Sequence, residues 1–328
     1  MRIGSFDTSE RVLVVAEIGQ NHEGDLAVAR ELVERAADAG ADAVKFQTFR
    51  TAEFVSQSDV ERFARMRRFE LEPEMWSELG ELAHRHGLLF ISTPLDLASA
   101  RLLTPLLDAF KIASGDVDFF PLLELVAATG KPAIMSTGQS EIDEVARAVA
   151  VLGEDVGILQ CVTSYPAPDE DVNLRAIAVL AERFPASTIG YSDHTVGLDA
   201  APLAVACGAR IIEKHFTLDK AFSEFRDHQL SADPADLNEL VRRIRAAEQL
   251  LGEARKEVQP SEVEMRHAVR RSIAAARRLP AGHALTSEDF IWTRPADGLR
   301  PGEEALLDGR KLRRDVEAGE HLRPEDVL

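Results

Sequence analysis

The sequence has few cysteines, few aromatic residues and no long apolar run. Its 328 residues include only two cysteines, Cys161 and Cys207, which excludes the disulfide-rich scaffolds of small secreted proteins and favours a cytoplasmic protein with reduced thiols. No apolar stretch reaches the roughly 20 residues of a membrane-spanning helix, and the chain does not open on a charged segment followed by an apolar one. We therefore expect no membrane span and no secretion leader.

Positive charge is also scarce. The chain has 38 Lys and Arg residues against 56 Asp and Glu residues, so its formal net charge is −18. A field of that sign repels phosphate backbones and anionic lipid, so we expect no nucleic acid and no membrane as partner. An anionic ligand would need a local positive pocket. Hydrophobic residues make up 45% of the chain, which is enough for a large core.

Short apolar runs alternate with segments of helical spacing from residue 11 to residue 251. Helical spacing fills most of the gaps, as in Leu26–Ala39 and Glu141–Leu152. The predicted strands are Val12–Ala16, Ala43–Phe46, Leu88–Ile91, Ala109–Ile112, Ala133–Met135, Val156–Leu159, Thr188–Tyr191 and Ile211–Ile212. Eight such units in roughly 240 residues predict an α/β fold, a closed (β/α)8 TIM barrel. An open doubly wound sheet is the alternative, but the segment Gly19–Gly24 lacks its GxGxxG phosphate turn.

The chain beyond the barrel predicts a second domain. A charged segment that ends at Pro260 is typical of a linker, so we expect a barrel over residues 1–252, a linker over 253–263 and a small domain over 264–328. Within that domain the pattern AGxxLxxED at residues 281–289 recurs at 318–326. This repeat indicates a pseudo-symmetric module that is rich in short strands and turns.

Polar residues gather where the predicted barrel strands end. In a (β/α)8 barrel the active site lies at the C-terminal ends of the strands, so such a gathering is expected of an enzyme. The residues are Glu17, Lys45, Gln47, Ser92, Thr93, Lys111, Ser114, Ser136, Thr137, Thr163, Tyr165, Ser192, Asp193, His194, Glu213 and His215. Lys45 and Lys111 stand out because the chain has only seven lysines. Two ammonium groups beside several hydroxyls suit a small ligand that carries phosphate and carboxylate.

His194 and His215 end neighbouring predicted strands, seven and eight, which brings two imidazoles within reach of one divalent cation. A structural zinc site would need four protein ligands, so we expect an open, catalytic site for Mn, Mg, Fe or Zn. Asp193 is predicted to orient His194 as a hydrogen-bond acceptor. The carboxylates Glu17, Asp116, Asp193 and Asp227 lie in or beside the same loops and are candidates for acid or base roles.

Successive motifs of this sequence resemble those of the sialic acid synthase family, also called N-acetylneuraminate or nonulosonate synthases, in the same order. The barrel motifs are AEIGQNHEGD at Ala16–Asp25, AGADAVKFQT at Ala39–Thr48, FISTP at Phe90–Pro94, KIASGD at Lys111–Asp116, GKPAIMSTG at Gly130–Gly138, YPAPDEDVNLRAI at Tyr165–Ile177, GYSDHTVG at Gly190–Gly197 and EKHFTLD at Glu213–Asp219. Two further motifs, RPADG at Arg294–Gly298 and GRKLRRDVEAG at Gly309–Gly319, are similar to those of its C-terminal antifreeze-like (SAF) domain.

The resemblance implies a barrel enzyme that condenses phosphoenolpyruvate, an open-chain N-acetylhexosamine and water to a nine-carbon 2-keto sugar acid and phosphate. It also implies a domain-swapped homodimer and a divalent metal, with Mn²⁺ as first choice and Mg²⁺ or Co²⁺ as alternatives. His194 and His215 would hold the metal, and Arg294 would reach the site from the partner subunit. The implied phosphoenolpyruvate residues are Lys45, Thr93, Lys111, Ser114, Ser136 and Ser192, and the implied sugar residues are Gln47, Tyr165 and Asp227. Thr163 is a further candidate on the substrate side.

Two choices remain open at the level of sequence. Either Glu17 or Asp116 handles the attacking water, with Glu17 preferred. The acceptor is N-acetylmannosamine by default, but a 2,4-diacetamido sugar that leads to legionaminic or pseudaminic acid competes, because the chain departs from the family pattern near the acceptor motifs. The rival functions are a metal-dependent aldolase or lyase on the same barrel and a non-catalytic carbohydrate-binding protein.

Overall fold

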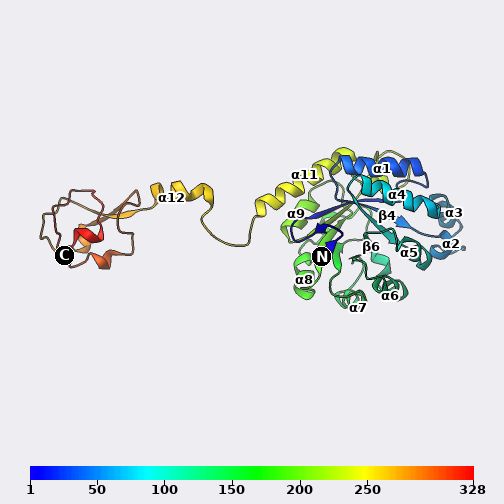
Figure 1. The fold of residues 1–328 in the computed structure, drawn as a ribbon, viewed down its shortest axis with the longest axis horizontal. Helices are drawn as coiled ribbons and strands as arrows, with labels where there is room; N and C mark the ends of the chain where they lie inside the picture. Colours follow the sequence, from blue (N-terminus) through cyan, green and yellow to red (C-terminus); the bar gives the residue numbers. More distant parts are fainter. The chain divides into compact units, whose positions relative to one another are not determined.

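The computed structural model describes residues 1–328, which form two compact units, Met1–Gly252 and Glu253–Leu328. The first unit is a closed barrel of eight parallel strands in the order β10-β3-β4-β5-β6-β7-β8-β9 (Figure 1). The strands are β3 (Leu13–Gly19), β4 (Ala43–Thr48), β5 (Leu89–Pro94), β6 (Ala109–Ile112), β7 (Ala133–Ser136), β8 (Gly157–Cys161), β9 (Thr188–Asp193) and β10 (Ile211–His215). The predicted TIM barrel is confirmed, and the open sheet is wrong.

Helices surround the barrel (Figure 1). They are α1 (Leu26–Asp38), α4 (Pro73–Arg85), α5 (Leu97–Leu103), α6 (Phe120–Ala128), α7 (Ile142–Leu152), α8 (Ala176–Arg183), α9 (Ala200–Ala206) and α11 (Pro234–Leu251), with the short α2 (Thr51–Phe54), α3 (Val60–Phe69) and α10 (Asp227–Leu230) in strand-end loops. Helix α1 shows why the boundaries fall where they do. The Asp25 carboxylate accepts from two N–H groups of the first turn, while Leu32 and Ala36 are buried. No helix of the chain is both long enough and apolar enough to cross a membrane.

Two apolar layers and a polar end divide the barrel. One layer lies between the strands and the helices, and includes Phe46, Phe90 and Leu32. The other fills the inside of the barrel near the N-terminal ends of the strands, where Ile3 of the hairpin β1 (Arg2–Ile3) and β2 (Phe6–Asp7) packs on Leu13. Toward the C-terminal ends the residues inside the barrel become polar, and that change of character positions the site.

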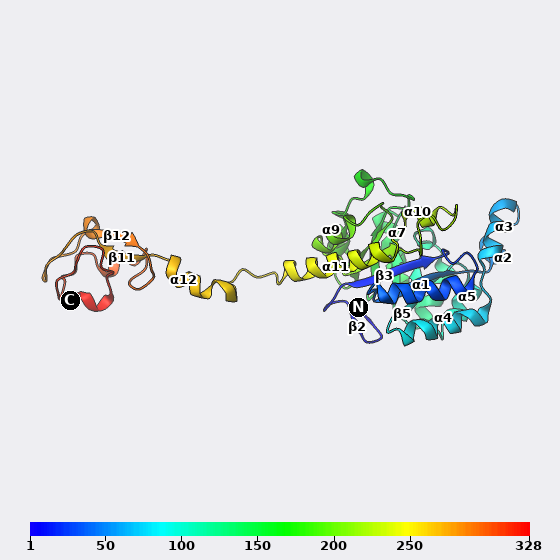
Figure 2. The same ribbon diagram turned by 90° about the horizontal axis from the view of Figure 1, so that it is seen from above.

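The C-terminal unit is built on the internal repeat. Its antiparallel strands are β11 (Ser272–Ala275) and β12 (Phe290–Thr293), labelled in Figure 2, and short helices precede them, η3 (Pro260–Glu262) and α12 (Val263–Val269). Both copies of the repeat end in a 3-10 turn, η4 (Ser287–Asp289) and η6 (Pro324–Asp326), whose buried aspartate accepts from a backbone N–H three residues earlier. The predicted β-rich module with two similar halves is therefore present.

Candidate active site

A small cavity of about 110 Å³ lies at the C-terminal ends of the barrel strands. Every strand or its following loop contributes to its wall. The lining residues are Glu17, Lys45, Gln47, Thr93, Lys111, Ala113, Ser114, Gly115, Ser136, Cys161, Thr163, Tyr165, Ser192, His194, Glu213 and His215. Most of the residues that the sequence predicts for the site thus meet in one place.

The Lys45 ammonium is held between two carboxylates. Its Nζ lies 2.8 Å from an oxygen of Glu17, 3.7 Å from one of Glu213, and donates to the Thr93 hydroxyl at 3.1 Å. The Lys45 side chain is 4% exposed, so these contacts replace water almost completely. Burial opposes the charged form of Lys45, but the two carboxylates outweigh it and raise the pKa of this lysine. Lys45 is therefore a fixed positive charge.

Lys111 shares Glu213 with Lys45. Its Nζ donates to Glu213 at 3.1 Å, and the Ser192 hydroxyl donates to the same oxygen at 2.9 Å. Burial alone would raise the pKa of Glu213, but Lys111, Lys45 and Ser192 outweigh it and lower that pKa to about 2. Burial lowers the pKa of Lys111 by more than Glu213 raises it. Burial raises the pKa of Glu17 to about 7 against the effect of Lys45.

Several polar atoms of the cavity have no partner within the chain. The hydroxyl oxygens of Ser136 and Thr163 and the Nδ1 atom of His215 are buried and make no hydrogen bond. A buried polar group without a partner costs about 1–3 kcal/mol, so three of them in one cavity are a feature that folding alone does not explain. They are the groups that a polar ligand would satisfy.

The two strand-end histidines face each other across the cavity, with ring centroids 5.3 Å apart. The Nδ1 atom of His194 donates to the carbonyl oxygen of Val162 at 2.8 Å, which leaves Nε2 with a free lone pair. Burial lowers the pKa of both rings, so both are neutral, as a metal ligand must be. No group of three or more His, Cys, Asp or Glu side chains is spaced to hold a metal ion.

Three further candidates, Gln47, Ser114 and Tyr165, line the cavity and contact neighbouring residues of the chain. Gln47 accepts from Gln20 at 2.8 Å and donates to Glu17 at 3.4 Å. The Ser114 hydroxyl accepts from the N–H of Gly138, and the Tyr165 ring stacks on that of His194 with centroids 4.2 Å apart. These contacts give Gln47, Ser114 and Tyr165 fixed places in the wall.

Asp227 and Asp116 do not line the cavity. Asp227 lies at its rim, 3.7 Å from Nδ1 of His215, and burial raises its pKa to about 6. Asp116 sits in the 3-10 turn η1 (Ser114–Asp116), where burial and then Asp118 raise its pKa to about 6. Arg294 belongs to the C-terminal unit, at the end of β12.

One sequence prediction is wrong, the role of one residue was overlooked and one residue was missed. Asp193 does not accept a hydrogen bond from His194, because its oxygens bind Thr195 and Lys214 instead. Glu213 was named among the strand-end residues but given no role, although it binds both lysines, and Cys161, which lines the cavity with a thiol whose pKa burial raises, was not named at all. The alternation of Glu213 with His215 along one strand is the signal that would have placed Glu213 in the same pocket as His215.

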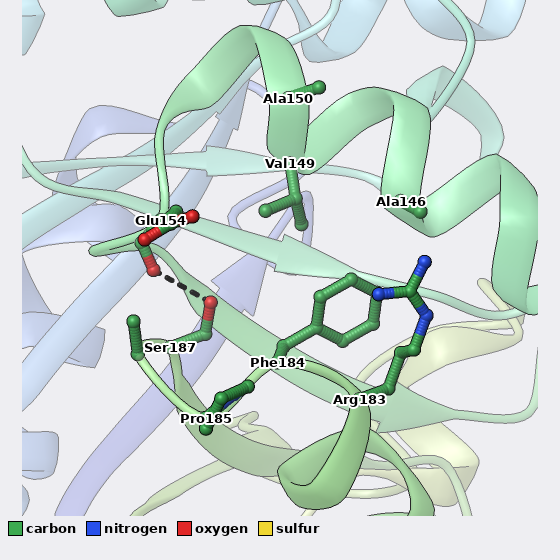
Figure 3. A pocket seen from close by; sticks show the side chains of 9 residues that line it. Ala146, Val149, Ala150, Glu154, Arg183, Phe184, Pro185 and Ser187 are labelled. Carbon is green, nitrogen blue, oxygen red and sulfur yellow. Dashed lines mark hydrogen bonds between the residues drawn. The ribbon is translucent and has the colours of Figure 1, made fainter.

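A larger cleft of about 360 Å³ lies between the end of α7 and the segment before β9. Figure 3 shows its wall, with Arg183 over the ring of Phe184 and the Ser187 hydroxyl donating to the carbonyl oxygen of Glu154 at 2.7 Å. Glu154 precedes β8 and Ser187 precedes β9, so this cleft is at the N-terminal ends of the strands. That end of such barrels serves stability and not catalysis.

Comparison with known proteins shows the family of both units. The NeuB family model matches residues 32–256, and the SAF domain model matches residues 270–328. An uncharacterized protein of Methanocaldococcus jannaschii is 44% identical over 324 residues, which cover 97% of this chain and 95% of that protein. The N,N'-diacetyllegionaminic acid synthase of Legionella pneumophila is 38% identical, over 98% of this chain and 96% of that enzyme.

A solved structure shows the same architecture. The crystal structure of an N-acetylneuraminic acid synthetase from Leptospira borgpetersenii, in complex with citrate, superposes with a TM-score of 0.77 at 34% identity and covers 81% of this chain and 94% of that one. Family models, full-length relatives and structure agree with the resemblance that the motifs indicate. The chain belongs to the NeuB family, and it is an enzyme of that family's phosphoenolpyruvate-dependent, carbon–carbon bond-forming type.

Proposed function

We propose that the chain condenses phosphoenolpyruvate with an open-chain N-acetylhexosamine and water to give a nine-carbon 2-keto sugar acid and phosphate. The observation that carries this proposal is the pair of buried ammonium groups of Lys45 and Lys111 in a cavity whose Ser136 and Thr163 hydroxyls have no partner. A small polyanion needs this combination of fixed charge and free hydrogen-bonding groups.

Phosphoenolpyruvate binds on the side of the two lysines in this proposal. Lys45 and Lys111 are now neutralised by Glu17 and Glu213, and the phosphate and carboxylate of the ligand compete for the same ammonium groups. The hydroxyls that complete this half are those of Thr93, Ser114, Ser136 and Ser192. Fixed positive charges in a site with little water stabilise negative charge that develops on the departing phosphate.

The acceptor sugar lies on the opposite side, against Gln47, Thr163, Tyr165 and Asp227. Carbon C3 of the enol attacks the aldehyde carbon, whose oxygen takes up a proton and becomes a hydroxyl, and positive charge is left at C2. Water adds to C2 and gives up its protons, and the C2–O bond to phosphate breaks, which forms the 2-keto group and releases phosphate. We assign the water to Glu17, because burial raises the pKa of Glu17 to about 7 and such a carboxyl exchanges a proton near neutral pH. Asp116 is the second choice because it does not line the cavity.

A divalent cation, Mn²⁺ by preference and Mg²⁺ or Co²⁺ as alternatives, would be held by His194 and His215. The residues fit this role because both rings are neutral, Nε2 of His194 carries a free lone pair, and Nδ1 of His215 is buried without a partner. Two protein ligands leave positions open for substrate. When bound, such a cation supplies Lewis acidity that polarises the aldehyde carbonyl.

We also propose that the enzyme works in the cytoplasm as a domain-swapped homodimer. Arg294 belongs to the C-terminal unit and would reach the acceptor in the barrel of the partner subunit. Its guanidinium fork matches an acetamido carbonyl or a pair of hydroxyls. The support for the swap is the resemblance of the motif at Arg294–Gly298 to the family pattern.

The acceptor is N-acetylmannosamine in the first instance. The likeness to a diacetyllegionaminic acid synthase favours a 2,4-diacetamido sugar as the second candidate. Incubating the protein with phosphoenolpyruvate, Mn²⁺ and a panel of free and 6-phosphorylated N-acetylated sugars, while phosphate is measured, tests both. Phosphate release that depends on one sugar supports the proposal. Cleavage of a 2-keto sugar acid without any reaction of phosphoenolpyruvate would show a lyase instead.

A further inference from the structure

A second pair of buried charges lies directly behind the two histidines. Along β10 the side chains alternate, so Glu213 and His215 face the cavity while Lys214 faces the surrounding helices. On the neighbouring strand β9, Asp193 is likewise turned away from the cavity. The two residues are register partners on adjacent strands, and their side chains are 1% and 0% exposed.

This pair forms a closed hydrogen-bond network with the turn after β9. Lys214 donates to a carboxylate oxygen of Asp193 at 3.1 Å and to the carbonyl oxygen of Thr195 at 2.6 Å. The other oxygen of Asp193 accepts from the Thr195 N–H at 2.9 Å, the Thr195 hydroxyl at 2.7 Å and the Tyr191 hydroxyl at 3.3 Å. Both charges are therefore paired and hydrogen-bonded, whereas the Ser136 and Thr163 hydroxyls in the cavity have no partner.

The network holds the backbone on both sides of His194, because Asp193 precedes this residue and Thr195 follows it. It also holds the backbone immediately before His215, because Lys214 is the preceding residue. A buried ion pair adds little to stability compared with apolar side chains of similar volume, so stability alone does not account for this one. A shared anchor between two strands does account for it.

We propose that Asp193 and Lys214 are positioning residues, which set the separation and orientation of the His194 and His215 rings. The proposal concerns residues that touch neither substrate nor cation, and it rests on the proposed function only where it predicts metal affinity. Asp193 thus acts on His194 through the backbone and not through a direct hydrogen bond.

The first test observes the rings themselves in metal-free protein. Histidine is labelled with ¹³C, and the ring signals are assigned with the His194→Ala and His215→Ala variants. In the paired variant Asp193→Asn/Lys214→Met, which leaves no unpaired buried charge, we expect the signals of both site histidines to shift. The signal of His84, which is on α4 and half-exposed, should not move.

A matched control separates positioning from loss of stability. Asp42 is another buried carboxylate, bound to Arg11, Arg245 and the N–H of Val14 at the N-terminal end of the barrel. Asp42→Asn should lower the thermal midpoint while the His194 and His215 signals stay at their wild-type positions. Manganese titrated into each metal-free protein should bind roughly tenfold more weakly, or worse, to the paired variant and unchanged to Asp42→Asn.

The outcomes distinguish the positioning role of Asp193 and Lys214 from the proposed metal site. Unchanged signals of both site histidines in the paired variant, with a thermal midpoint lowered as in Asp42→Asn, would overturn the positioning role. If manganese binds to none of the proteins, the metal assignment of the proposed function fails, and the ring signals still decide the positioning role.

Discussion

Both ends of the barrel bury charged groups, but they differ in whether all their buried polar groups have partners within the chain. At the N-terminal ends of the strands, Asp42 is bound by two arginines and a backbone N–H of its own chain, and Ile3 closes the apolar interior. At the C-terminal ends, Lys45 and Lys111 share two carboxylates, while Ser136 and Thr163 have hydroxyls without partners. At the N-terminal end Asp42 has its partners within the chain, whereas the C-terminal end has hydroxyls that can bind a ligand.

This difference teaches where to look for function in a barrel of this kind. Both ends bury charged groups, so burial of charge alone does not mark a site. The larger cleft at the N-terminal ends holds an arginine and a glutamate but no buried polar side-chain atom without a partner. Unsatisfied polar atoms together with the two buried lysines, Lys45 and Lys111, distinguish the smaller cavity from it.

The histidines should give the largest effect on activity. We expect His194→Ala and His215→Ala each to abolish turnover while the fold is retained, because both rings line the cavity and neither fills the apolar core. Phosphate release and circular dichroism measure the two properties. Near-normal turnover with unchanged dependence on manganese in either variant would remove the metal assignment and weaken the contrast between the ends.

The lysines should give the next largest effect. Lys111→Met should raise the KM for phosphoenolpyruvate far more than that for the sugar, because a charge-assisted contact in a partly dry site is worth ~1.5–3 kcal/mol, roughly a factor of ten to a hundred in affinity. Lys45→Met should behave alike. Lys131 precedes β7 and donates to the carbonyl oxygen of Leu107, so Lys131→Met is the matched control at the other end and should change neither constant.

A collapse of sugar affinity with unchanged affinity for phosphoenolpyruvate in both variants would mean that the two substrates have been assigned to the wrong sides. An equal effect of Lys131→Met would break the comparison between the two ends.

Arg294→Ala should have a smaller effect, confined to the sugar. We expect a raised KM for the acceptor or a lower turnover, with the KM for phosphoenolpyruvate unchanged. Mixing this variant with His215→Ala under conditions of subunit exchange sharpens the result. A swapped dimer then contains one barrel with both residues intact, so part of the activity returns. Failure of activity to return after exchange is confirmed by mass would exclude action across the dimer.

Asp42→Asn should have no effect on turnover per folded molecule. It replaces a carboxylate that binds two arginines and a backbone N–H, so we expect a loss of about 1–3 kcal/mol in the free energy of unfolding. Chemical denaturation and the phosphate assay measure stability and turnover side by side. A large fall in turnover at unchanged stability would mean that the N-terminal end also takes part in function.

The sequence predicts the eight strands because their apolar runs are buried on both faces, but it ends most of them too early. The last strand was predicted as Ile211–Ile212 and continues to His215, since polar side chains that face a site interrupt the apolar run. The hairpin β1–β2 was not predicted, because two-residue strands carry no periodicity. Apolar runs therefore locate the strands, but they stop short of the strand ends that carry the site residues.

The site was predicted as a set of residues and not as a set of pairs. Glu213 binds Lys111, which lies 102 positions earlier, and only the tilt and closure of the barrel bring them together. Asp116 was predicted, like Glu17, as a candidate acid or base. It lies in the 3-10 turn after β6 and does not line the cavity. Side-chain pairs across a barrel depend on how the barrel closes, and local sequence patterns carry no information about that closure.

The proposed condensation is tested most sharply by following the oxygen that bridges carbon and phosphorus in phosphoenolpyruvate. With ¹⁸O at that position, condensation at the strand ends breaks the C–O bond, so we expect the released phosphate to carry the label and its release to require the acceptor sugar. Mass spectrometry of the phosphate and of the organic product, with and without the sugar, measures the position of the label and the dependence of release on the sugar. Label retained in the organic product, or phosphate released at the same rate without any sugar, would contradict the proposed condensation.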